Sequence, residues 1–335
     1  MPRKVGTEWI LCGTLALMAA GCESLQRHEA LVYAQKGMAS LEAGQADRAL
    51  AEFQQAAEKD ETFAFAHAKI GDIQAGKGNY TAARKNYSQA LEANPGEFDY
   101  AVRLGQAYRL LGQIAEAARA YVYACDLDPG SFKANLELAN CYLQMGQTHQ
   151  AQEYYGRALQ IDSTNAEAFQ NLAVAQESAG QNDLAIHSYL ESIEQNPTET
   201  RILTNLATCY LRQKQPHLAE QALRRAVILD NRDAAIYRQL GYCLFLQKKF
   251  DQAEDEYRRA IEMGLDPAAH TGIGTVMMAR YISQEQPRDE LLRGRALQHW
   301  QRSLELKPDQ PRLAALVARY AQPAVPVGPT GQAKR

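Results

Sequence analysis

Residues 132–165 read FKANLELANCYLQMGQTHQAQEYYGRALQIDSTN, and this stretch holds one copy of a pattern that recurs along the chain. Its Ala151 belongs to a series of alanines that are spaced 34 residues apart. That series is Ala49, Ala83, Ala117, Ala151, Ala185, Ala219 and Ala253. A second small-residue series runs twelve positions earlier through Gly37, Gly71, Gly105, Ala139, Ala173, Ala207 and Gly241. Two series in phase predict an array of similar supersecondary units.

Each repeat is predicted to be a pair of antiparallel helices. We number repeats 1 to 7 from residues 30, 64, 98, 132, 166, 200 and 234. Apolar residues at positions 7, 10 and 11 lie on one face of a first helix, and positions 20, 24 and 27 do the same on a second. Glycine at position 15, such as Gly146, ends the first helix. Small residues at positions 8 and 20 let the two helices approach closely beside an aromatic residue at position 24, such as Tyr155.

This residue set resembles the tetratricopeptide repeat, and the resemblance covers residues 30 to about 265 without an insertion. It implies an all-α fold, a right-handed α-solenoid of about eight helix pairs with a capping helix. Such solenoids serve widely as surfaces that bind other proteins.

The repeat pattern divides the chain into segments. The expected segments are a signal peptide at 1–21, a short tether at 22–29, seven regular repeats at 30–265, an irregular eighth repeat with an inserted loop at 266–308, a capping helix at 309–321 and a disordered tail at 322–335. The eighth repeat pairs a helix from His270 to Tyr281 with one from Leu291 to Leu306. In its first helix, Gly272 and Gly274 are interpreted as a helix-packing feature.

The N-terminus has the features of an export signal. Arg3 and Lys4 precede an apolar run that is too short to span a bilayer, and small residues lead to Cys22. The sequence around Cys22 resembles the lipobox of bacterial lipoproteins, which implies cleavage after Gly21 and lipidation of Cys22. An ordinary secretory signal with an incidental cysteine is the alternative. We expect a membrane-anchored lipoprotein facing the periplasm, with the outer membrane favoured over the inner.

No pattern for catalysis or for cofactor or metal binding is found. The net charge of −3 gives no general attraction to nucleic acid, and no small-molecule substrate is indicated. The histidines show no metal-ligand spacing; they are His28, His67, His149, His187, His217, His270 and His299. Cys125, Cys141, Cys209 and Cys243 lack paired spacing and are interpreted as buried packing thiols. The sequence therefore predicts a protein that is not an enzyme and needs no cofactor or metal.

Binding is expected on the first helices, which line the groove in the family that this chain resembles. We call the side chains at positions 2, 5, 6, 9, 12 and 13 of the repeats the first-helix face. The candidate peptide-binding residues are Lys69, Arg103, Arg109, Lys133, Asn140, Asn171, Arg201 and Asn205. Guanidinium and amide groups suit the backbone and acidic side chains of an extended or helical partner segment.

Two other interpretations of this face stay open beside distributed binding. Asn140, Asn171 and Arg201 are similar to part of a carboxylate clamp, although Leu136 stands where the clamp has lysine and Asn205 where it has a second basic residue. The face is otherwise a solvated polar groove without a fixed ligand. In repeats 6 and 7 an apolar group either binds an amphipathic helix or packs against the eighth repeat. That group is Leu211, Tyr242, Phe245 and Leu246.

Together these features predict a lipid-anchored interaction scaffold at a bacterial envelope membrane, with a protein partner. The combination resembles the repeat-bearing lipoproteins that assist assembly of pili or of secretin pores. The alternative is an adaptor that recruits or regulates an envelope enzyme such as a peptidoglycan hydrolase or protease. A third possibility is a subunit that presents substrate to a separately encoded enzyme.

Overall fold

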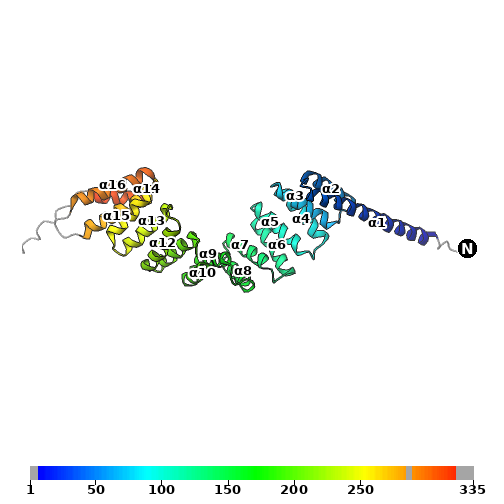
Figure 1. Cartoon of the computed structure of the whole chain (residues 1–335), viewed down its shortest axis with the longest axis horizontal. Coiled ribbons are helices and arrows are strands. Elements are labelled where there is room, and N and C mark those ends of the chain that lie inside the picture. Colours follow the sequence, from blue (N-terminus) through cyan, green and yellow to red (C-terminus); the bar gives the residue numbers. More distant parts are fainter. Residues whose placement is uncertain (1–6, 284–288, 322–335) are drawn as a thin grey trace, which may run out of the picture. The chain divides into compact units, whose positions relative to one another are not determined.

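The chain folds into helices throughout the part that the structure describes. The computed structural model describes residues 7–283 and 289–321, and these contain 17 helices and no strand (Figure 1). The chain divides into two compact units, Met1–Thr164 and Asn165–Arg335, which we call the N-terminal and the C-terminal unit. The predicted all-α class is confirmed.

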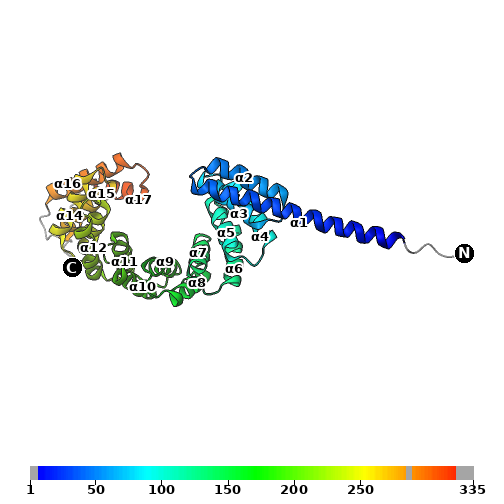
Figure 2. The same ribbon diagram turned by 45° about the vertical axis from the view of Figure 1, so that its right-hand side comes forward.

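Within each unit, consecutive helices pack against each other as antiparallel pairs (Figure 2). The N-terminal unit contains α1 (Thr7–Glu42), α2 (Ala46–Lys59), α3 (Ala64–Gly76), α4 (Tyr80–Ala93), α5 (Phe98–Leu110), α6 (Ile114–Leu127), α7 (Phe132–Gln144) and α8 (Thr148–Ile161). The C-terminal unit contains α9 (Ala166–Ser178), α10 (Asn182–Gln195), α11 (Thr200–Arg212), α12 (Pro216–Leu229), α13 (Ala234–Leu246), α14 (Phe250–Met263), α15 (Pro267–Ser283), α16 (Glu290–Leu306) and α17 (Pro311–Ala321). Each odd-numbered helix up to α13 carries the first helix of a repeat, as the periodicity predicted.

The two small-residue series lie where helix pairs approach most closely. The ring of Tyr87 fills the space beside Gly71, where an added β-carbon would lie 2.5 Å from the ring. Tyr121 takes the same place beside Gly105, at 2.9 Å. All seven alanines of the first series are fully buried. Position 8 is therefore small because the aromatic ring at position 24 of the same repeat occupies the volume of a side chain.

The turn inside each regular repeat needs a left-handed residue at position 15. Gly146 there has φ +74°, and Gly78 has φ +78°. Repeats 6 and 7 place Lys214 and Lys248 at the same position, with φ 58° and 61°. The lysines adopt a conformation that costs an L-residue about 1–2 kcal/mol, so the surrounding repeat imposes this turn even without glycine.

The turns between repeats are closed by side chains that accept backbone hydrogen bonds. The Asp128 carboxylate accepts from the Gly130 amide at 3.0 Å, and Asp162 accepts from the Thr164 amide at 3.0 Å. Ser131 then caps α7 by accepting from the Ala134 amide at 3.3 Å. These polar residues satisfy amides at the turn and at the start of the next helix, which fixes where that helix begins.

The last helices follow the predicted irregular repeat. Helices α15 and α16 form its pair, and α17 matches the predicted capping helix. The α15 glycines have the packing role inferred from the sequence, because a β-carbon on Gly272 or Gly274 would lie 2.4 Å from the rings of Tyr257 and Trp300 respectively. Residues 284–288 of the inserted loop and the predicted tail at 322–335 lie outside the described residues.

The first helix is longer than the repeat requires. α1 runs from Thr7 to Glu42, so the predicted tether at 22–29 is helical and continuous with repeat 1. Residues 23–36, which include this tether, contain neither glycine nor proline, so nothing in them interrupts the helix. Among the described residues, no helix combines the length and the apolar character needed to cross a membrane.

The four repeat cysteines are buried free thiols, as predicted. Burial raises the pKa of Cys141 to about 11 and that of Cys243 to about 12. Because only the thiolate is nucleophilic, and an unfolded cysteine has a pKa of about 8.5, we expect iodoacetamide at pH 8 to label these two residues slowly in the native protein and rapidly in urea. Peptide mass spectrometry measures both rates. Equal rates in the two states would contradict the burial.

Candidate functional site

The first-helix face of the N-terminal unit is a chain of paired polar groups. The Tyr87 hydroxyl of α4 donates to the Asp72 carboxylate of α3 at 3.0 Å. Arg103 of α5 also donates to Asp72, and Lys69 forms a longer ion pair with it at 3.5 Å. Burial and the nearby Asp72 charge raise the pKa of Tyr87, which keeps this hydroxyl a donor. Two predicted binding residues, Lys69 and Arg103, are thus joined around one carboxylate.

The same pairing continues along this unit. Arg109 of α5 lies 3.5 Å from the Glu137 carboxylate of α7, and Asn140 accepts a hydrogen bond from the Tyr155 hydroxyl at 2.6 Å. Lys133, at the start of α7, is exposed to solvent. The tyrosine at position 24 thus serves two purposes, since its ring packs between helices and its hydroxyl holds a polar residue of the face.

The C-terminal unit holds the remaining predicted residues. Arg201 is exposed and pairs with Glu199 at 3.1 Å, while Asn171 and Asn205 are partly buried. Asn140 belongs to the other compact unit, so the three residues that are similar to a carboxylate clamp are divided between the two units.

A further pairing in the C-terminal unit repeats the tyrosine motif. Glu177 of α9 accepts from the Tyr189 hydroxyl at 3.0 Å and forms an ion pair with Arg212 of α11 at 2.7 Å. Successive first helices are therefore linked by charge pairs in both units. Exposed pairs of this kind contribute only about 0–1 kcal/mol each, so they orient side chains more than they stabilise the fold.

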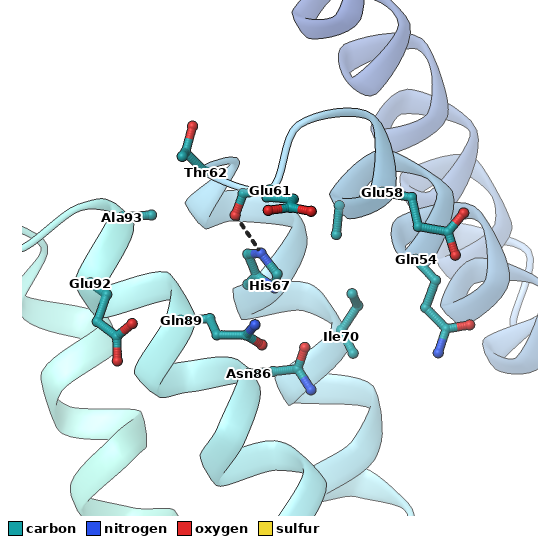
Figure 3. Close-up of a pocket in the computed structure, with 11 residues that line it drawn as sticks. Gln54, Glu58, Glu61, Thr62, His67, Ile70, Asn86, Gln89, Glu92 and Ala93 are labelled. Carbon is teal, nitrogen blue, oxygen red and sulfur yellow. Dashed lines mark hydrogen bonds between the residues drawn. The ribbon is translucent and has the colours of Figure 1, made fainter.

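A cavity in the N-terminal unit lies on the side of the second helices α2 and α4. It has a volume of about 760 Å³ and lies between α2, which supplies Glu58, and α4, which supplies Gln89 and Glu92 (Figure 3). His67 of α3 lines it, and the His67 Nε2 lies 2.9 Å from the Glu61 carbonyl oxygen. A carbonyl only accepts, so Nε2 carries the proton of the neutral ring.

His67 has a structural explanation that other repeats share. Asn135, at the same repeat position, donates to the Pro129 carbonyl at 3.1 Å, and the Tyr237 hydroxyl donates to the Asn231 carbonyl at 3.3 Å. In all three repeats the side chain at position 4 bonds a carbonyl six residues earlier. We therefore interpret His67 as an anchor of the turn between repeats and assign no ligand to the cavity beside it.

A smaller apolar cavity opens on the first-helix face of the C-terminal unit. It has a volume of about 360 Å³ and lies between α13 and α15. Aromatic rings from three positions line it, namely Tyr242, Phe245 and Tyr257. Gly272 of α15 completes the lining, and its missing side chain leaves the Tyr257 ring room at the cavity wall. This arrangement of rings beside a glycine suits a large apolar side chain from another molecule.

Two polar side chains, Arg238 and Gln239, also line this cavity. Gln239 lines it, and the Gln239 Oε1 atom is buried without a hydrogen-bond partner in the described part of the chain. Arg238, also in the lining, is held by Asp266 at 2.6 Å. A buried acceptor without a donor is costly, and a rotation of the Gln239 side chain that opened Oε1 to the cavity would let an incoming N–H group satisfy it.

The two interpretations of the apolar group predicted in repeats 6 and 7 stay predictions, and its members differ in exposure. Phe245 packs beside Phe250 with ring centroids 6.0 Å apart, and Leu211 is partly buried against the core. Tyr242 and Leu246 stay 46% and 42% exposed. The sequence pattern indicated Tyr242 and Phe245, which line this cavity, but not the Gln239 acceptor, because the environment of that atom depends on helix packing.

The comparisons with known proteins agree with the repeat assignment. Models of the tetratricopeptide repeat match residues 68–132, 132–165, 166–199 and 204–270, together more than half of the chain. No curated protein matches the sequence.

Solved structures share the fold at low sequence identity. The C-terminal part of a TPR repeat-containing protein from Cytophaga hutchinsonii is 16% identical, with a TM-score of 0.62 over 74% of this chain and 98% of that one. PilF of Pseudomonas aeruginosa is 20% identical, with a TM-score of 0.52 over 66% of this chain and 97% of that one. YrrB, described as having an unusual peptide-binding site, is 21% identical, with a TM-score of 0.50 over 60% and 99%. The chain therefore belongs to the tetratricopeptide repeat family.

Proposed function

We propose that this protein is a non-catalytic interaction scaffold that binds a partner segment on the first-helix face of its C-terminal unit. The cavity between α13 and α15 carries the proposal, because it combines aromatic walls with the unpartnered Gln239 oxygen. The occupant is an extended or helical peptide segment with one large apolar side chain in the cavity. One of its N–H groups donates to Gln239.

The first-helix face differs between the two units, and this difference supports the choice of site. In the N-terminal unit, Asp72 already binds Lys69, Arg103 and Tyr87, so a ligand there must compete with these internal partners. At the α13–α15 cavity, a ligand displaces water from exposed rings instead, and apolar burial is favourable. Tyrosine is also among the side chains most often found at the energetic centre of interfaces.

A peptide selection tests the proposal directly. Random peptides displayed on phage and selected on the purified protein should be enriched in a leucine, phenylalanine or tryptophan anchor flanked by variable residues. Enrichment of acidic peptides without such an anchor would place binding on the charged part of the face and contradict the proposed site.

We further propose that Cys22 carries a lipid anchor that holds the scaffold at the envelope membrane, with the outer membrane favoured. The support is the lipobox-like sequence that ends at Cys22 after a short apolar run. Two or more acyl chains give stable anchoring.

Metabolic labelling tests the anchor. In a bacterial host fed an alkyne-bearing fatty acid, the wild-type chain should be labelled, and a Cys22→Ala variant should lose the label completely. A Cys125→Ala variant should keep it, since Cys125 is buried in the folded repeats. A wild-type chain without label would contradict the anchor.

The finer role that we propose is assistance in assembling a pilus or a secretin pore. The fold likeness to PilF and the anchored architecture support it, although the likeness concerns the fold. Partner capture from native membranes separates the possibilities. Recovery of a pore or pilus subunit supports assembly, whereas recovery of a peptidoglycan hydrolase or protease supports an adaptor.

A further inference from the structure

Two histidines that lie far apart in the sequence meet in the last helix pair. His270 of α15 and His299 of α16 bring their Nδ1 atoms to 3.1 Å, and their ring centroids lie 5.3 Å apart with 34° between the planes. The spacing of histidines along the chain predicted no such pair. Antiparallel packing creates it, because α15 and α16 lie side by side although His270 and His299 are 29 residues apart in the sequence.

This contact places two nitrogen lone-pair sites side by side. A neutral imidazole carries one proton on its two nitrogens, so a short contact between two Nδ1 atoms pairs one N–H with one lone pair. Burial lowers the pKa of both rings. The nearby charges are Arg302 and Asp266 for His270, and Arg258 for His299. The hydrogen bond between the two Nδ1 atoms also requires that at least one ring is neutral, which is the state that binds metal ions.

We propose that His270 and His299 form a chelating pair for a divalent transition-metal ion such as Zn²⁺, Ni²⁺ or Cu²⁺. Metal–nitrogen bonds of about 2.0–2.1 Å from two nitrogens 3.1 Å apart meet at an angle of about 95–100°. This lies between the square-planar and tetrahedral values. Imidazole is a preferred ligand of these three ions. To bind, the ring that donates moves its proton from Nδ1 to Nε2, and both rings turn so that their Nδ1 lone pairs point at the ion and no longer at each other.

The surrounding contacts hold the two helices together beside the histidines. Trp300, next to His299, donates from its indole nitrogen to the Thr271 carbonyl beside His270 at 3.2 Å. The hydroxyls of Thr271 and Ser303 lie 2.8 Å apart and join the same two helices. Because the backbones are held together on both sides, little conformational entropy is lost when the ion binds.

The site has two protein ligands and leaves the other coordination positions to water or to a partner. The described residues contain no cluster of three or more histidine, cysteine or acidic ligands. Mg²⁺ and Ca²⁺ prefer oxygen ligands, so a pair of imidazole nitrogens favours the transition-metal ions over them. Neither histidine is among the residues that line the α13–α15 cavity.

Trp300 makes the site directly measurable. The chain has two tryptophans, so a Trp9→Phe variant leaves Trp300 as the sole indole, adjacent in sequence to His299. Titrating this full-length variant with NiCl₂ at pH 7.5 should quench its fluorescence to saturation at one equivalent. Either His270→Gln or His299→Gln should weaken the apparent affinity at least tenfold, whereas His149→Gln, in the N-terminal unit, should leave it unchanged. Circular dichroism checks that each variant is folded.

A second metal ion and a lower pH provide two further tests of the site. Calorimetry with ZnCl₂ should show the same loss in both site variants, and at pH 5 protons should compete with the ion and reduce its affinity in the wild-type chain. Quenching that does not saturate would overturn the proposal. Quenching that persists unchanged in both His270→Gln and His299→Gln would overturn it as well.

Discussion

Replacing Tyr121 by alanine should lower the free energy of unfolding of the N-terminal unit by about 3–5 kcal/mol. Tyr121 is 1% exposed and belongs to the apolar core formed by α5, α6 and α7. Its ring occupies the space beside Gly105, so truncation leaves a cavity that neither glycine nor neighbouring alanines fill. Neighbouring repeats stabilise each other, so the loss should extend to α5 and α7.

Tyr123→Ala is the matched control on the same helix. Tyr123 is 38% exposed, and its hydroxyl donates to the Pro95 carbonyl at 2.9 Å. Its loss should therefore cost only about 0.5–1.5 kcal/mol, the value of one hydrogen bond. Urea denaturation followed by circular dichroism, with hydrogen exchange to locate the change, measures both variants. Equal costs for the two tyrosines would contradict the packing of Tyr121.

The second large effect is on binding. A Tyr242→Ser variant should bind an apolar-anchored peptide, obtained by selection on the wild-type protein, about 30-fold more weakly, which corresponds to a loss of about 2 kcal/mol. Tyr242 lines the α13–α15 cavity and is 46% exposed, so its ring is available to a ligand. The same exposure means that folding stability should change by no more than about 0.5 kcal/mol.

Ile228→Ser provides the control for this prediction. Ile228 lies on α12, a second helix, and is 83% exposed. Replacing it therefore removes more exposed apolar surface than replacing Tyr242 does, and it leaves the cavity unchanged. Its Kd for the same peptide should stay within about twofold of wild type. A similar loss in both variants would indicate non-specific apolar binding and would rule out the cavity as the site. Fluorescence anisotropy with a labelled peptide measures both constants.

The helix pairs were predictable because their determinants repeat locally. Gly105 and Tyr121 belong to one repeat and recur at fixed positions, so the spacing alone indicates which side chains meet. The left-handed turns at Lys214 and Lys248 were not marked by glycine, yet the repeat imposes the same backbone there. Periodicity therefore carried more information than residue type at this position.

The repeat pattern could not predict which side chains of the first-helix face are paired with each other. Whether Arg103 faces solvent or reaches Asp72 depends on the offset between α3 and α5, which follows from helix packing. The unpartnered oxygen of Gln239 and the contact of His270 with His299 also follow from helix packing, so the sequence did not predict them. These features depend on the residue that stands at one position in a single repeat, whereas the repeat pattern describes only what all repeats share.

Site-specific photo-cross-linking in living cells tests the central claim most directly. A benzoylphenylalanine introduced at Tyr242, beside the α13–α15 cavity, should give one discrete adduct with a partner protein after illumination. The same probe at Tyr123, on the second-helix side of the N-terminal unit, should give none. Absence of an adduct at Tyr242, or the same set of adducts at both positions, would contradict a binding site in the C-terminal unit.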